Sequence, residues 1–213
     1  MSEINVYTNS LSDDLIPQLI KRFKDYEMEV EISPYFSFVN VDEDNCPYYD
    51  SLVFKFVMKN PAHQLVKDKI LRLKLGFSIN DFDLEDAKSD IEQPEQSFID
   101  KLLRRKKEII EFAPPKFESQ LKRFKKVSSF YVSSGITYDY RFAYLISTIL
   151  AELTYGIYSI TDEEYSITDK DLKSVTTWEK GSSELTDKTY KQIIAHEKGI
   201  PDDDFDFQEF KGW

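Results

Sequence analysis

The sequence predicts an α+β protein with a mixed or antiparallel sheet, a buried central helix and amphipathic helices packed on it. Three observations predict this class. Several short segments alternate apolar and polar residues with the period of two that half-buried strands show. Other segments repeat apolar residues every three or four positions, as amphipathic helices do. One run, residues 138–160, is apolar on nearly every side of a helix and can form the centre of a core.

The first third of the chain predicts a β-α-β-β order. An apolar stripe over residues 15–26 predicts a helix with Pro17 in its first turn, where the missing N–H costs little. Residues 71–79 alternate leucine, phenylalanine and isoleucine with other residues and predict one continuous strand. By alternation or by β-branched and aromatic content, further strands are predicted at residues 4–8, 28–32 and 52–58.

Residues 80–96 are acidic, short of core residues and contain Pro94, so they predict a linker or a long surface loop. The expected organisation is a single α+β domain, residues 1–213. A possible subdivision places a β-α-β-β part at residues 1–79 and a helical and hairpin part at residues 97–200.

Two basic helices are predicted after this acidic stretch. Ser97 and Asp100 have the spacing of a capping box at the start of the first, which Pro114 and Pro115 stop. The second carries an apolar side, and a strand over residues 127–132 follows it. The apolar side consists of Phe117, Leu121 and Phe124.

The central helix is predicted to begin after Thr137 as N-cap and to end at Gly156, a residue that adopts a left-handed C′ conformation without strain. A short hairpin is expected next, with strands at 157–160 and 165–167 joined by the acidic turn 161–164. Beyond it, residues 169–181 have no clear pattern apart from Trp178 as an anchor, and residues 184–200 predict a helix ending at Gly199.

Composition predicts a folded, soluble, cytoplasmic protein. Of the 213 residues, 41% are hydrophobic and 15% aromatic, which is ample for a core. Cys46 is the only cysteine, so no intramolecular disulfide is possible. The N-terminus lacks the basic and apolar regions of a signal peptide, and no apolar run approaches the ~20 residues of a membrane span. A substrate of a secretion system that needs no signal would look the same.

The net charge of −11 disfavours direct binding to nucleic acid or to an anionic membrane and favours a basic partner or simple solubility. Charge is unevenly distributed. Residues 101–126 contain ten basic and three acidic residues, a balance of +7, so the rest of the chain carries −18. We interpret this basic stretch as a solvated outer face; contact with nucleic acid is the alternative.

No catalytic residue, cofactor-binding motif or metal site is predicted. The two histidines, His63 and His196, lie in no metal-ligand spacing, and a nucleophile formed by Cys46 with either would require a meeting in space that sequence does not show. Glycine-rich phosphate loops are absent. The acidic runs at residues 81–86 and 202–206 could bind a divalent cation, but neither has the glycine and terminal glutamate of a calcium loop.

The acidic, aromatic C-terminus is the predicted partner-binding surface. Carboxylates beside phenylalanine rings can occupy a basic cleft, as a protein inhibitor occupies the site of a nucleic-acid enzyme. The alternative is a tail whose phenylalanines dock on their own domain. The candidate partner-binding residues are Asp202, Asp203, Asp204, Phe205, Asp206, Phe207 and Glu209.

One part of the chain resembles a known group. From Ser133, the run SSG, a helix ending in LAELTYG at residues 150–156 and then IYSITDEEYSIT resemble small cytosolic bacterial proteins, several of which are immunity proteins of polymorphic or contact-dependent toxin systems. Members often have Gly-Gly where this chain has Tyr155-Gly156. The resemblance implies a non-catalytic protein that neutralises a cognate toxin, and it implies no particular contact residues.

The first hypothesis is therefore an acidic binding protein, an immunity protein for a basic toxin such as a nuclease. A hydrolase or transferase that uses carboxylates with His63 or His196 is the second. A structural or regulatory phage or host protein without a toxin partner is the third. A basic toxin gene beside this one would favour the first, a ligand in a deep pocket the second, and self-assembly the third.

Overall fold

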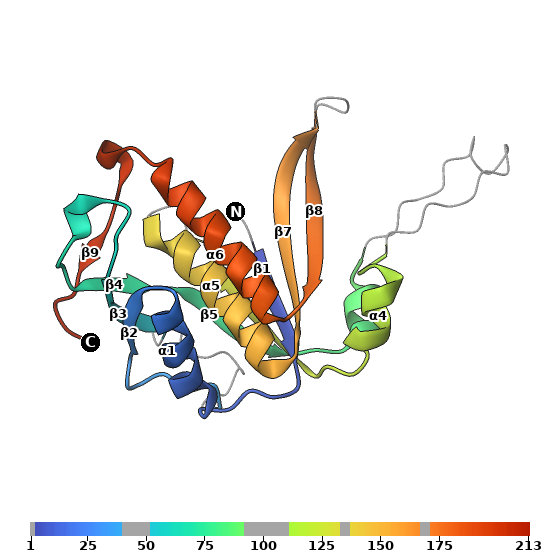
Figure 1. Ribbon diagram of the computed structural model, residues 1–213. Coiled ribbons are helices and arrows are strands. Elements are labelled where there is room, and N and C mark those ends of the chain that lie inside the picture. The colour runs from blue at the N-terminus through green and yellow to red at the C-terminus, as the bar shows by residue number, and fades with distance from the viewer. Residues whose placement is uncertain (1–2, 40–51, 92–110, 133–136, 167–170) are drawn as a thin grey trace, which may run out of the picture.

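Two antiparallel sheets with a long helix packed on them form the protein (Figure 1). The computed structural model describes residues 3–39, 52–91, 111–132, 137–166 and 171–213, without the side chains of residues 163–166 and 171–173. One sheet has the order β5-β6-β1-β7-β8, the other β2-β3-β4-β9, and every pairing between described residues is antiparallel. The strands are β1 Glu3–Thr8, β2 Met28–Ile32, β3 Val53–Met58, β4 Leu71–Lys74, β5 Gly76–Asp81, β6 Lys126–Tyr131, β7 Ile157–Ser166, β8 Asp171–Lys180 and β9 Gln208–Glu209. The predicted α+β class is confirmed.

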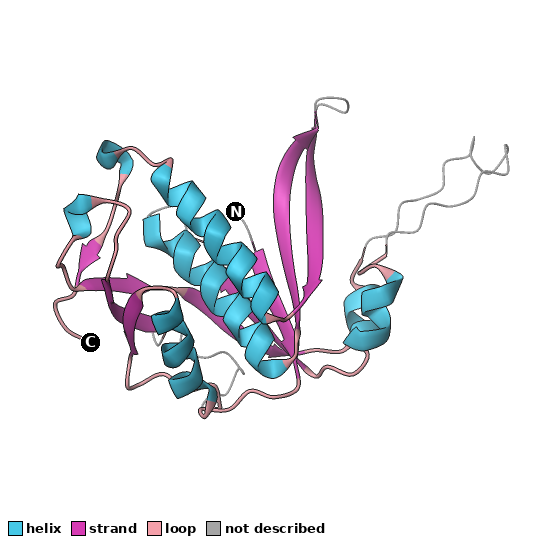
Figure 2. Cartoon of the chain, in the orientation of Figure 1, coloured by secondary structure: helices cyan, strands magenta, loops and turns pink. Residues whose placement is uncertain are grey.

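The central helix is α5, and α1 and α6 lie beside it on the same side of the sheets (Figure 2). Phe142, in the first half of the helix, is fully buried and contacts the rings of three phenylalanines at centroid distances of 4.6–5.5 Å. These rings come from α1 and β3, so α5 joins the elements into one core. The helices are α1 Leu15–Asp25, α2 Leu84–Ser89, α4 Pro115–Leu121, α5 Thr137–Thr154 and α6 Ser183–Lys198, with 3₁₀ turns η1 Gln64–Val66 and η2 Asp202–Asp204.

A second, smaller core covers the other face of the five-stranded sheet. Tyr7 of β1 stacks on Trp178 of β8 at 5.6 Å, and α4 adds Phe117 and Leu121 to the cluster. Trp178 is therefore an anchor, as the sequence predicts. The predicted second basic helix corresponds to α4, whereas residues 97–110 of the first lie outside the described residues.

The strand predicted at residues 71–79 is two strands in two sheets. β4 pairs with β3, and β5 pairs with β6. Leu75, between them, is buried, so the alternation of buried leucine and phenylalanine continues through the corner. The period of two reports which face a side chain occupies and not which strand is the neighbour, so the break was invisible in the sequence.

Strands that precede residues 80–96 in the chain pair with strands that follow them. β1 pairs with β7, and β4 pairs with β9 near the C-terminus. The acidic stretch itself begins with the last residues of β5, and α2 follows with Asp83 as its N-cap. The carboxylate of Asp83 accepts the backbone N–H of Glu85 at 2.8 Å and that of Asp86 at 3.3 Å. Residues 92–96 lie outside the described residues.

The predicted short hairpin is a long ribbon instead. Residues 161–164, expected to turn, belong to β7, and residues 171–180, which had no clear pattern, form β8. β1 pairs with β7 only from Ile157 to Thr161, whereas β8 pairs with β7 as far as Ser166, so the ribbon extends past the sheet (Figure 1). A ribbon outside the core needs no buried face, which explains the missing alternation.

Helix α5 ends in a Schellman motif whose left-handed residue is Tyr155, not Gly156. The N–H of Gly156 bonds to the carbonyl of Ala151 at 2.8 Å, and that of Tyr155 to Glu152 at 3.3 Å. Tyr155 has φ +53°. Gly156 is required for another reason, since a Cβ there would lie 2.6 Å from the carbonyl oxygen of Tyr7 on β1. The predicted helix end is right, and the predicted role of its glycine is wrong.

Replacing Tyr155 with glycine is expected to raise the free energy of unfolding by up to about 1 kcal/mol. A tyrosine is strained in the left-handed conformation, and glycine is not. The Tyr155 side chain is 80% exposed, so its removal loses few packing contacts. Urea unfolding checks this, with Gly156→Ala as the opposite control, because its new methyl group meets the β1 backbone. A lower unfolding midpoint for Tyr155→Gly would contradict the expectation.

Candidate functional site

The seven predicted partner-binding residues lie on one C-terminal segment that folds back onto the protein. After α6, Pro201 leads into η2, and β9 then pairs with β4, with Leu71 opposite Glu209 and Arg72 opposite Gln208. We call residues 202–206 the acidic ledge and residues 207–213 the terminal strap. Both have a defined structure, and β9 is paired with β4, so the segment is not a free tail.

The carboxylates of the acidic ledge point outward and its phenylalanine points inward. Asp203, Asp204 and Asp206 are exposed, and the Asp202 side chain is 72% exposed. Phe205 is only 7% exposed, packed against the rings of His63 at 4.1 Å and Tyr138 at 5.4 Å. Phe205 therefore holds the ledge in place, and its ring is not open to a partner. Alternation of Asp with Phe was the sequence signal for this arrangement.

The end of the acidic ledge and the terminal strap are held by several contacts. The N–H of Asp206 bonds to Thr137 Oγ1 at 3.1 Å, and the N–H of Thr137 bonds to the carbonyl of Asp206 at 3.2 Å. Lys69 forms an ion pair with Glu209 at 2.7 Å, which lowers the pKa of that carboxyl, and lies over the Phe207 ring at 4.5 Å. These contacts occupy Glu209 and partly cover Phe207, so the open acids are those of the ledge.

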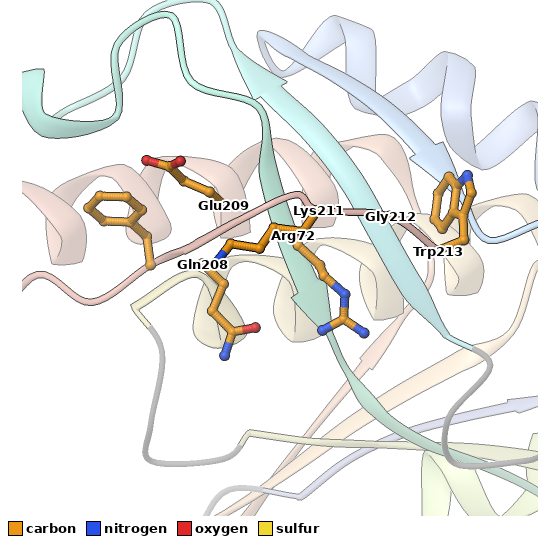
Figure 3. A pocket seen from close by; sticks show the side chains of 7 residues that line it. Arg72, Gln208, Glu209, Lys211, Gly212 and Trp213 are labelled. Atoms are coloured by element: carbon orange, nitrogen blue, oxygen red, sulfur yellow. The ribbon is translucent and has the colours of Figure 1, made fainter.

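A groove of about 660 Å³ runs between the terminal strap and β4. Arg72 and Gln208 point to the same side in Figure 3, as their paired positions on β4 and β9 require, while Glu209 points to the other. The rest of its lining consists of Phe207, Lys211, Gly212 and Trp213. The groove lining mixes both signs of charge, with Arg72 and Lys211 beside Glu209.

His63 connects the acidic ledge to the interior. Its Nδ1 lies 2.7 Å from Asp202 Oδ1 and its Nε2 lies 3.0 Å from the carbonyl oxygen of Glu197, and the side chain is 7% exposed. Burial lowers the pKa of His63, but the bonds to Glu197 and Asp202 outweigh it, and the net direction is upward. Neither ring nitrogen is open to a substrate.

Behind His63 lies a buried ion pair between the two long helices. Arg141 of α5 donates from Nε to Glu197 Oε1 at 2.6 Å and from Nη2 to Glu197 Oε2, with side chains 0% and 1% exposed. Burial lowers the pKa of Arg141, but the bonds to Glu197 outweigh it and the net direction is upward. Arg141 lies inside the run predicted to form the buried central helix, and no partner was predicted for it. The signal was present, since a lone arginine inside an apolar helix requires a buried acceptor.

The structure does not bring the other candidate residues together. His196 is exposed and its ring packs in a tilted arrangement against Tyr140 at a centroid distance of 4.4 Å, on another side of α6 from the buried Glu197. Cys46 lies outside the described residues. Asp81 pairs with Lys126 at 2.7 Å, and the Asp83 carboxylate caps α2. Within the described ranges, no cluster of three or more histidines, cysteines and carboxylates could hold a metal ion.

No family model matches this chain, and searches of curated proteins and of solved structures gave no match. The site is thus characterised by its own geometry. It combines outward carboxylates, an inward phenylalanine and a polar network in which the buried residues His63, Glu197 and Arg141 connect to the exposed Asp202. Among the described helices, none is long and apolar enough to cross a membrane.

Proposed function

We propose that this chain is a non-catalytic binding protein whose acidic ledge docks on a basic protein, and that the partner is a toxin that it neutralises, such as a nuclease. One observation carries the proposal. Three exposed carboxylates, Asp203, Asp204 and Asp206, stand on a segment fixed by Phe205, Thr137 and His63. Fixed carboxylates are already arranged for a basic surface, so less conformational entropy is lost on binding than a free tail would lose.

The charge of the whole chain supports the same role. A net charge of −11 accelerates the encounter with a basic partner and repels nucleic acid, which competes for the same partner. Asp203 and Asp204 make no ion pair with any described residue, so binding would not have to break an internal one first. The resemblance of residues 133–168 to toxin-immunity proteins suggests the class of partner.

The proposal is tested by capturing the tagged protein from its native cells at low and at high salt and identifying what stays bound. We expect one basic protein, held in stoichiometric amount and released by salt. With that protein purified, Asp203→Lys/Asp204→Lys is expected to raise Kd by about tenfold or more. The reason is that two attractive charges become repulsive.

The matched control is Asp14→Lys/Asp90→Lys, which changes the net charge equally at two exposed residues, the N-cap of α1 and the C-cap of α2. It is expected to alter the association rate slightly and to leave the dissociation rate unchanged. Equal effects of the two double variants would mean that net charge matters and that the ledge is not the contact surface. Capture of no basic partner from cells that express one would contradict the proposed function itself.

A further inference from the structure

His63 occupies a position where it can control the acidic ledge. It lies just before η1, after the turn that follows β3, and its ring is buried against Phe205. One ring nitrogen faces Asp202, the first residue of η2, and the other faces the last turn of α6. The ring thus joins its own loop to two consecutive segments, the end of α6 and η2, whose bonded residues lie 134 and 139 residues further along the chain.

Both partners of the ring are acceptors. The carbonyl oxygen of Glu197 cannot donate, so Nε2 must carry a proton to bond at 3.0 Å. An ionised Asp202 carboxylate also accepts only, and at 2.7 Å it requires a proton on Nδ1. A neutral imidazole has one N–H and satisfies one partner, whereas the imidazolium satisfies both. The geometry therefore matches the protonated ring.

The charges around the ring favour the same form. From η2 it faces the Asp202 carboxylate, and from α6 it faces Glu197, whose carboxylate is paired with Arg141 of α5. Tyr138 of α5, which packs on Phe205, contributes a hydroxyl that stays neutral because burial raises its pKa. The only uncompensated charge facing His63 among these described groups is therefore negative.

We infer that His63 is a proton-operated latch: the protonated ring fixes the acidic ledge and the start of the terminal strap on the body of the protein, and deprotonation releases them. Loss of the proton on Nδ1 turns an attraction to Asp202 into a repulsion between two acceptors at 2.7 Å. Phe205, stacked on the same ring, loses part of its support. This inference holds whether or not the ledge binds a toxin.

The sign of the pH dependence follows from linkage. The pKa of His63 is raised in the folded protein above its ordinary value of 6.5. The stabilisation is therefore complete below about pH 6.5 and is lost as the pH rises through the raised pKa. The latch is expected to be closed below about pH 6.5 and to open as the pH rises through the raised pKa.

The chain contains only two histidines, which makes the test direct. Histidine NMR signals are followed between pH 5 and 9, with exposed His196 as the internal reference, and hydrogen exchange is measured at the amides of Asp204, Phe205 and Asp206. After correction for intrinsic exchange, protection of these amides is expected to fall by up to about tenfold for each pH unit between about pH 6.5 and the raised His63 pKa, and to level off above that pKa. Protection within α5 should not change.

Two variants decide the outcome. Asp202→Asn should lower the His63 pKa, and the loss of ledge protection should move to lower pH with it. His196→Gln should leave both unchanged. The inference is overturned if His63 titrates while the ledge amides keep constant protection, or if its pKa lies at or below the ordinary histidine value of about 6.5. Because Asp202 is exposed, its substitution does not endanger the fold.

Discussion

Replacing Glu197 with alanine is expected to lower the free energy of unfolding by about 3–5 kcal/mol. The substitution leaves the Arg141 guanidinium, 0% exposed, without its acceptor in the middle of the protein. The rings of Tyr138 and Tyr190 lie 5.9 and 5.8 Å from Arg141 Cζ and cannot replace a carboxylate. The loss should exceed that caused by any exposed ion pair of the protein, because those pairs are solvated.

Urea unfolding of two further variants separates this mechanism from lost packing. Glu179→Ala removes an exposed pair with Lys188 and should cost less than about 1 kcal/mol. Arg141→Met/Glu197→Leu removes both buried charges and should recover most of the stability lost by Glu197→Ala. A double variant as unstable as Glu197→Ala would show that the shape of the site, and not the uncompensated charge, determines the loss.

Local periodicity predicted the elements whose environment is uniform along their length. The buried, exposed alternation of β2 was present in its sequence of Met, Val and Ile between glutamates. The amphipathic stripe of α1 and the apolar circumference of α5 were equally clear. In each case a single face, or every face, meets the core from one end of the element to the other, so the pattern does not change.

Elements that change environment were predicted poorly. β4 and β5 share an uninterrupted alternation and yet belong to different sheets, because the corner at Leu75 keeps the same residues inward. The end of α5 shows a different limit. Glycine is preferred at a left-handed C′ position, but Tyr155 occupies it, since the neighbouring position needs Gly156 for the close approach of β1. Residue preferences at helix ends are averages over many proteins, and tertiary contacts can override them at a particular position.

In the candidate site, too, the local features could be predicted from the sequence, whereas the contacts between distant residues could not. The outward carboxylates and the inward ring of Phe205 followed from alternation within a few residues. The link between His63 and Asp202 spans 139 residues, and that between Arg141 and Glu197 spans 56. No periodic signal reaches over such separations. Sequence could show that Arg141 needed an acceptor, but 39 acidic residues were available to supply it.

The second large effect is expected at the junction of the β7–β8 ribbon with the helices. Gly181 lies between β8 and the N-cap of α6, with its N–H bonded to the carbonyl of Gly156 at 2.9 Å. A Cβ at this position would lie 2.1 Å from the carbonyl oxygen of Ala151. That oxygen accepts the bond that ends α5, so the backbones of two elements would have to separate.

Gly181→Ala is therefore expected to lower the free energy of unfolding by about 3 kcal/mol or more, the upper end of the range for overpacked sites, because backbone atoms cannot rotate away as side chains can. Gly199→Ala is the matched control. It adds the same methyl group where the nearest atom is 3.3 Å away and φ is −86°, so a change within about 1 kcal/mol is expected. Urea unfolding of both variants measures the difference. Equal midpoints would mean that β8 and α6 separate from α5 easily, and hence that the ribbon is only loosely attached to the helices.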